Sequence, residues 1–332
     1  MKRPWWLLAA ALPLSLAIPF AIGGWEGLRE LRRIPLWIVV AGVAMISLGW
    51  VAQALKLKLI MQGVGESISS VKALATVLAS EFASSATPAG TGAAITETFL
   101  LHRHGLSSAK AASVFALEQI LDLFFFVTAL VVLALVLLTG PEDFHLGLQI
   151  VTMGLLLGGG FTGLWFFARH YRPVLLWTGR LLERFHVAAR RRKQIARWVI
   201  RFRHGLSLIL GFSRWRLSAI YMLAACHWML RYSALYLIIE ALGFHVPWSY
   251  LFFIQMFSLG IGQMTLLPGG SGSVEVSFSI LLAPWLGAGT IAATLIAWRF
   301  VTYYWYFIVG GPVFLAFAGR SLWRRINAPS GE

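Results

Sequence analysis

This chain has few charged residues for its length. Only 12% of its 332 residues are charged, and 13 acidic residues stand against 28 lysines and arginines. With 58% hydrophobic residues and a mean hydropathy of +0.75, a soluble domain of this length could not cover its surface with so few charges. The composition therefore predicts an integral membrane protein.

Cysteine and the common catalytic motifs are scarce as well. The single cysteine, Cys226, cannot form an internal disulfide, and its apolar neighbours are typical of packing. The sequence contains no Gly-x-Ser-x-Gly nucleophile motif, no Cys/His metal-ligand spacing and no phosphate-binding loop signature. We therefore predict no metal site and no cofactor.

The positive charge is concentrated in one part of the chain. Between Arg169 and Arg216 lie 13 of the 28 lysines and arginines, with Glu183 as the only acid. Such a cluster suits anionic headgroups at the cytoplasmic face, so we predict membrane lipids as partners and no nucleic acid. Within it, 171–204 mixes leucines and arginines, which favours an amphipathic segment along the inner interface; a solvated cytoplasmic helix is the alternative.

Six apolar segments are long enough to cross a bilayer. They are 5–22, 36–58, 109–138, 147–169, 215–240 and 288–318. The first has the layout of a signal peptide, but further spans follow it and we expect a transmembrane anchor. Lysines and arginines between the spans gather on one side, so the positive-inside rule predicts cytoplasmic N- and C-termini. We expect one polytopic domain over 1–332.

Two Pro-Gly breaks interrupt the remaining apolar sequence, one at 87–92 and one at 267–272. Their flanking arms, 68–86/91–104 and 248–266/271–285, are each shorter than the ~20 residues that a spanning helix needs. Each pair predicts a re-entrant helical hairpin or two thin crossings. The expected fold class is therefore all-α integral membrane, with about six full transmembrane helices plus two re-entrant helical hairpins.

The two breaks align at an offset of 180 residues. Pro88 then matches Pro268, Gly90 matches Gly270, Thr91 matches Ser271, and Gly92 matches Gly272. The flanking spans also correspond, and under the predicted topology they run in opposite directions. We therefore predict an inverted repeat of 36–138 and 215–318. In secondary transporters, interrupted segments at matching positions of two halves mark the substrate site.

The second arm of each hairpin would point a helix N-terminus at the membrane midplane. Free N–H groups and the positive end of the helix dipole favour an anion there, such as a lipid phosphate. The predicted substrate-binding residues are Thr87, Pro88, Gly90, Thr91, Gly92, Glu97, Pro268, Gly269, Gly270, Ser271, Gly272 and Glu275. The alternative is a packing turn, in which glycines let the two arms approach closely.

Ionisable residues within the apolar segments predict a polar path or a coupling site. They are Glu81, Glu118, Asp122, Arg231 and Arg299. Glu118 and Asp122 are four residues apart on one helix face and would tend to share a proton, which suits proton coupling. Arg231 and Arg299 are the opposing bases. A purely structural ion pair between the halves is the alternative.

Four motifs occurring in order carry a family resemblance. They are Thr87–Gly92 with Leu100–Gly105, Leu117–Asp122, Leu267–Glu275, and Trp298-Arg299. Over about 10–320 the chain resembles the flippase-like family named after the transmembrane domain of bacterial lysylphosphatidylglycerol synthases. The resemblance implies a multi-pass inner-membrane protein that moves lipids between leaflets.

Within this resemblance, the residues at the family's polar positions are Glu118, Asp122, Glu275 and Arg299. Gln119 stands where the family often has arginine, and alanines stand at 93 and 94 where an acid often follows the first glycine turn. No soluble aminoacyl-transferring domain follows Arg325, so we expect no lysyl-lipid synthesis.

The predicted function is a lipid translocase that moves an anionic or isoprenoid-type lipid between leaflets of the bacterial inner membrane. A membrane glycosyltransferase or lipid-modifying enzyme, with Glu97, Glu275 or Asp122 as base, is one alternative. Another is a non-catalytic accessory protein of hopanoid or other lipid biosynthesis, with lipid-biosynthesis enzymes as partners.

Overall fold

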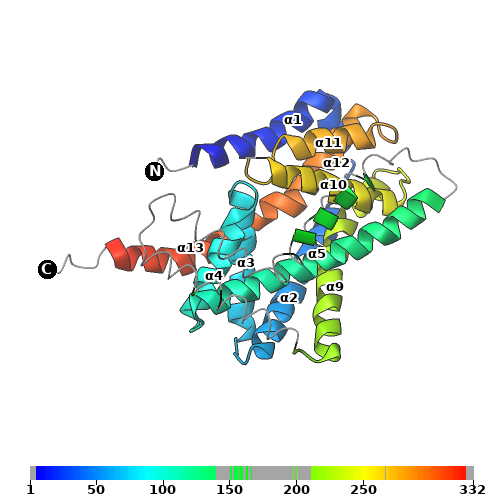
Figure 1. Ribbon diagram of the computed structural model, residues 1–332. Helices are drawn as coiled ribbons and strands as arrows, with labels where there is room; N and C mark the ends of the chain where they lie inside the picture. The colour runs from blue at the N-terminus through cyan, green and yellow to red at the C-terminus, as the bar shows by residue number, and fades with distance from the viewer. Residues whose placement is uncertain are drawn as a thin grey trace, which may run out of the picture. The chain divides into compact units, whose positions relative to one another are not determined.

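The computed structural model describes residues 5–139 and 211–326, except Leu266, together with scattered residues between 150 and 200. In these residues the chain is helical and forms no strand, which confirms the all-α fold class (Figure 1). The helices are α1 (Trp5–Leu31), α2 (Leu36–Gly63), α3 (Ser70–Ala86), α4 (Thr91–Arg103), α5 (Ser108–Thr139), α9 (Arg214–Ala241), α10 (Trp248–Met264), α11 (Ser273–Leu282), α12 (Ala288–Arg299), the π-helical turn η1 (Phe300–Tyr304) and α13 (Trp305–Ile326).

Four stretches of the described chain are long and apolar enough to cross a membrane. They are Leu36–Gly63, Ser108–Val136, Arg214–Ala241 and Ala288–Phe317. These match four of the six predicted spans. The predicted span 5–22 lies within α1, which is not among the four and is interrupted at Gly24, whose φ of 51° leaves the helical region. The span 147–169 is described only in part, and the basic segment 171–204 lies almost wholly outside the described residues.

The chain divides into two compact units. The first contains Met1–Leu55, Ser70–Leu100 and Ala225–Glu332, and the second contains Lys56–Ser69 and Leu101–Ala224. Both turns with a Pro-Gly break therefore belong to the first unit, whereas α5 belongs to the second. The helices α2, α4 and α9 each contribute residues to both units.

Small residues bring α1 against α12 in the first unit. A Cβ atom added to Gly23 would lie 2.4 Å from the Cβ of Ala292, and one added to Gly289 would lie 2.6 Å from the Glu26 side chain. The absence of side chains at these glycines lets the backbones approach, as at helix interfaces in membranes. A hydrogen bond of 2.6 Å between the hydroxyls of Ser15 and Tyr304 adds a polar contact to this packing.

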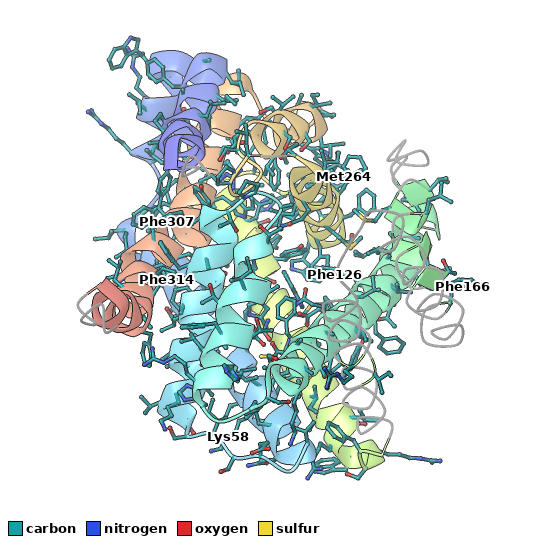
Figure 2. All side chains as sticks on the ribbon, turned by 60° about the vertical axis from the view of Figure 1, so that its left-hand side comes forward. Lys58, Phe126, Phe166, Met264, Phe307 and Phe314 are labelled. Carbon is teal, nitrogen blue, oxygen red and sulfur yellow. The ribbon has the colours of Figure 1, made fainter. Side chains whose placement is uncertain are left out.

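The last helix packs along the first arm of the first hairpin. The ring of Phe82 on α3 lies 5.3 Å from that of Phe307 and 5.1 Å from that of Phe314, both on α13 (Figure 2). Between them, Gly310 allows close approach, because an added Cβ would lie 2.6 Å from the carbonyl oxygen of Leu78. These contacts fix α3, and with it the position from which the first turn begins.

In the second unit, two polar contacts join α5 to other segments. Lys110 at the start of α5 pairs with Glu66 at 2.6 Å. Farther along α5, the hydroxyls of Thr128 and Tyr221 share a hydrogen bond of 2.7 Å. These contacts hold α5 against the neighbouring segments of its own unit.

Candidate functional site

The two predicted hairpins form, with arms close to the expected bounds. The first consists of α3 and α4 and the second of α10 and α11. Their turns carry the same hydrogen bonds at an offset of 180 residues. In the first, Gly90 N donates to Thr87 O at 3.3 Å and Thr91 N to Pro88 O at 3.2 Å. In the second, Gly270 N donates to Leu267 O at 3.1 Å and Ser271 N to Pro268 O at 3.3 Å. The side-chain hydroxyls of residues 91 and 271 each donate to the proline carbonyl at 3.0 Å.

The backbone angles of the turns agree as well. Ala89 and Gly90 have φ of 50° and 64°, and their counterparts Gly269 and Gly270 have 62° and 64°. Ala89 is the one non-glycine residue with positive φ among the described residues. A left-handed conformation costs a residue with a Cβ about 1–2 kcal/mol, so the first turn carries strain that the second avoids.

Pro88 and Pro268 pair with each other in an antiparallel β-bridge. The residues that the sequence aligns at an offset of 180 thus face each other with opposite chain directions, as equivalent residues do beside a twofold axis. The bridge lies within the first unit. It brings the two turns, far apart in sequence, into one place.

The turns differ in how they cap the helix that follows. Gly92 N, at the start of α4, donates to the neutral hydroxyl oxygen of Thr87 at 2.7 Å. Gly272 N, before α11, donates to the carboxylate of Glu275 at 2.7 Å. An acidic side chain therefore already occupies the α11 N-terminus, and an incoming anion would have to share that end with it. The first turn of α4 contains no acid.

Several glycines that the sequence assigned to substrate binding are needed for packing. An added Cβ on Gly92 would lie 2.3 Å from Ala83 O, one on Gly269 would lie 2.2 Å from the Tyr303 ring, and one on Gly270 would lie 2.6 Å from Gly262 Cα. These distances support the alternative interpretation of both turns as close-packed. Gly272 has more space, with no atom nearer than 3.7 Å, but its φ of 96° favours glycine. Gly90 also has a positive φ, and an added Cβ would lie 3.2 Å from the Gln263 side chain.

Exposure separates the turns further. Ala89 and Thr91 are exposed in the first turn, whereas Pro268, Gly270 and Ser271 are buried in the second. Met264, which ends α10 beside the second turn, is exposed (Figure 2). Of the two turns, the first is the one whose tip a ligand could reach without displacing protein.

Arg299 forms a buried ion pair with the second hairpin. Its Nε donates to Glu275 at 2.7 Å and its Nη1 to the carbonyl oxygen of Gly269 at 3.1 Å. The side chains of the pair are 3% and 0% exposed. The guanidinium also lies over the rings of Trp298 and Tyr303, 5.3 and 5.2 Å from their centroids. We expected Arg299 to oppose the Glu118–Asp122 face; the structure instead pairs it with an acid in its own half.

Asp122 has a different partner from the one the sequence suggested. Lys56 Nζ donates to its two carboxylate oxygens at 3.0 and 3.3 Å, and Lys56 is 1% exposed. This buried cation is a partner of Asp122 that the sequence did not suggest, and proton sharing with Glu118 stays a prediction. Glu118 and Glu97 are buried at 7% and 5% exposure, in the second and first unit respectively.

Arg231 lies at a third cluster, in the first unit. Its Nη1 donates to the Tyr306 hydroxyl at 2.7 Å, and its guanidinium lies over the rings of Trp228 and Tyr306, 5.6 and 5.1 Å from their centroids. Its ion-pair partner is Glu81, with 3.8 Å between Nη1 and Oε2. Since Glu81 belongs to the first predicted repeat and Arg231 to the second, this pair connects the halves.

Sequence reasoning missed Lys56 and the aromatic partners of the arginines. Lys56 and Lys58 both stood near a predicted cytoplasmic end. Two residues along a helix place side chains on nearly opposite faces, and Lys58 is only half-buried (Figure 2). Trp298 is buried and donates from Nε1 to Gln255 at 3.0 Å, and Tyr306 is fully buried. The spacing of Trp228 and Arg231, three residues apart on one helix, was the available signal.

Among the described residues, no three His, Cys, Asp or Glu side chains are grouped as metal ligands. Asp122, Glu81 and Glu275 each lie in an ion pair with a lysine or arginine.

Comparison with known proteins gives two matches. The family described as "Lysylphosphatidylglycerol synthase TM region" matches residues 5–310. A protein of Archaeoglobus fulgidus described as "UPF0104 membrane protein" is 26% identical over 280 residues, which cover 81% of this chain and 83% of that protein. Both descriptions agree with the helical, apolar architecture.

Proposed function

Because the chain belongs to the family of the lysylphosphatidylglycerol synthase transmembrane region, we propose that it is a lipid translocase, which moves an anionic or isoprenoid-type lipid between membrane leaflets. It carries out no covalent chemistry on that lipid in this proposal. The membrane is the bacterial inner membrane, and both termini lie in the cytoplasm.

The observation that supports this function best is the meeting of two hairpin turns at Pro88 and Pro268. Helices that break inside an apolar region leave backbone groups without partners, at a cost of several kcal/mol per group in lipid. Such breaks are tolerated where protein or a hydrated cavity satisfies them, and transporters place substrate there. Paired turns of equal geometry fit a site between two inverted halves.

Within this proposal the two hairpins have different tasks. The second is held by the buried Glu275–Arg299 pair and serves as the fixed side. The first presents exposed residues, Ala89 and Thr91, and the first turn of the helix that follows contains no acid. An anionic headgroup is expected to pass beside the first turn, where it meets N–H groups and no competing carboxylate.

Lipid movement in proteoliposomes tests the proposal. The purified chain is reconstituted with phosphatidylglycerol that carries a fluorophore on its headgroup, and an impermeant reductant is added outside. With active protein, fluorescence should fall below the level set by the outer leaflet, because inner-leaflet lipid becomes accessible. Protein-free vesicles and vesicles containing an unrelated polytopic protein are the controls. A folded chain that leaves the inner-leaflet signal unchanged, for this lipid and for an isoprenoid phosphate, would contradict the proposal.

The enzyme alternative is separated by mass spectrometry of the same vesicles. After incubation with activated sugars or aminoacyl donors, a translocase leaves the lipid masses unchanged. A new lipid mass formed in proportion to the donor consumed would replace the translocase with a lipid-modifying enzyme.

A further inference from the structure

Arg231 differs from Arg299 in how fully its charge is satisfied. Arg299 makes charge-assisted hydrogen bonds to Glu275 at 2.7 Å and to Gly269 O at 3.1 Å. Arg231 makes one hydrogen bond, to the neutral hydroxyl of Tyr306, among the residues that the structure describes. Each guanidinium also has one buried nitrogen without a hydrogen-bond partner in that part of the chain, Nε of Arg231 and Nη2 of Arg299, so the difference lies in the two charge-assisted bonds that Arg231 lacks.

The acid near Arg231 is too distant for a hydrogen bond. Glu81 Oε2 lies 3.8 Å from Nη1, beyond the 2.7–3.2 Å typical of N–H···O bonds. A guanidinium has five N–H donors in a planar fork that matches the oxygens of phosphate or carboxylate. Arg231 therefore keeps donors available on a residue that lies within the candidate span Arg214–Ala241.

The side chains of the Arg231–Glu81 pair are partly exposed. They are 17% and 23% exposed, whereas those of Arg299 and Glu275 are 3% and 0% exposed. Arg231 is ten residues before the end of its helix at Ala241, about 15 Å along the helix axis. An anion that reaches it comes along the membrane-spanning part of the protein, where lipid headgroups are the expected source of phosphate if the proposed function holds.

We propose that Arg231 binds the phosphate of the transported lipid, and that Glu81 is an internal anion that this phosphate displaces. This inference rests on the proposed function and specifies its substrate as a lipid with a net negative phosphate headgroup. Tyr306 and Trp228 hold the guanidinium in place through the hydrogen bond and the two ring faces. The phosphate then receives the fork of N–H donors that Glu81 leaves unused.

The displacement also links binding to movement. Glu81 lies on α3 of the first hairpin and Arg231 on α9 of the second predicted half. When phosphate replaces Glu81 at Arg231, the first hairpin loses an ion pair with that half. A ligand shifts a conformational equilibrium by its difference in affinity for the two states, and exchange of this pair supplies such a difference.

Native mass spectrometry of the full chain in detergent, titrated with phosphatidylglycerol or zwitterionic phosphatidylcholine, measures the binding. Arg231→Gln should weaken phosphatidylglycerol binding by about 10-fold or more, since hydrogen bonds to charged groups are the stronger class. Arg231→Lys should retain part of the affinity. Glu81→Gln should strengthen binding several-fold, because it removes the competing charge. Arg29→Gln removes an exposed arginine from α1, outside the basic cluster, and should leave the preference for the anionic lipid unchanged.

Inorganic phosphate added as competitor identifies the source of the anion. Displacement of phosphatidylglycerol only at far higher concentrations supports a lipid ligand, whereas equal affinity would assign the site to the free ion and overturn the proposal. Equal binding of phosphatidylglycerol by wild type and by folded Arg231→Gln would also overturn it. If Arg231→Gln does not fold, Glu81→Gln decides: unchanged or weaker binding contradicts displacement.

The lipid-movement assay separates the two proposals. If binding depends on Arg231 but no lipid moves, the proposed translocase function is contradicted and the proposed anion site is supported. If lipid moves at the same rate in the Arg231→Gln variant, the proposed function is supported and the proposed anion site is contradicted.

Discussion

The two hairpins of this protein share a backbone and differ in charge. Both turns have positive φ at the same two aligned positions and the same backbone hydrogen bonds. In both, a side-chain hydroxyl also donates a hydrogen bond to the carbonyl oxygen of the proline. The first uses Thr87 to cap the next helix and exposes its tip, whereas the second uses Glu275, which Arg299 neutralises. One turn geometry can thus serve either as a rigid support or as an accessible surface, depending on the side chains that surround it.

The difference in charge between the hairpins is also visible when the two halves are aligned at the offset of 180 residues. The residue 180 positions before Arg299 is Gln119, and the one before Glu275 is Ile95, so the first half lacks both members of the buried pair. Gln119 and Ile95 are exposed. We infer that the ion pair stabilises one hairpin only, and the predictions below test how far the asymmetry extends.

The largest effect is expected from breaking the buried pair. Arg299→Gln or Glu275→Gln alone should destabilise the protein by about 3–5 kcal/mol, because each leaves an uncompensated buried charge. The aligned substitution Gln119→Ala should change stability by less than about 0.5 kcal/mol, as is usual at the surface. Unfolding in mixed micelles, followed by tryptophan fluorescence, measures both. A single-residue variant at 299 or 275 as stable as wild type would show that the pair contributes nothing to the second hairpin.

A smaller effect is expected from substitutions at the first left-handed position of each turn, Ala89 and Gly269. Gly269→Ala should cost about 3 kcal/mol, because a Cβ there overlaps the Tyr303 ring and adopts an unfavourable φ. Ala89→Gly should change stability by no more than about 1 kcal/mol, since relief of strain and the entropy of glycine in the unfolded chain oppose each other. The same unfolding experiment applies. Equal losses at both positions would mean that the turns are packed alike.

The smallest effect is expected at the exposed tip of the first turn. Asp and Asn both tolerate the left-handed region, so Ala89→Asp and Ala89→Asn differ mainly in charge. Ala89→Asp should slow the movement of phosphatidylglycerol about fivefold, because two like charges 4 Å apart in water repel by about 1 kcal/mol. Ala89→Asn should transport like wild type. If both variants move lipid at the wild-type rate, the anionic headgroup does not pass this turn.

The hairpins could be predicted from the sequence because their signals are local. Pro-Gly turns end and begin helices through fixed backbone preferences, and the bounds of α3, α4 and α10 fall within two residues of the expected arms at the turns. The ion pairs could not be predicted, because they join residues far apart in sequence: 24 positions for Arg299 and Glu275, and 66 for Lys56 and Asp122. Many acid–base combinations satisfy the same apolar pattern, and only the packing of the helices selects among them.

Inverted repetition of the two hairpin-containing halves is the central claim, and accessibility from each side of the membrane tests it most directly. In a Cys226→Ala background, single cysteines are placed at the exposed residues Ser108 and His245, which follow the first hairpin and precede the second. They are then labelled with an impermeant maleimide in right-side-out and inside-out vesicles. The account predicts that residue 108 reacts only from the cytoplasmic side and residue 245 only from the outer side. Reaction of both from the same side would contradict the inverted arrangement.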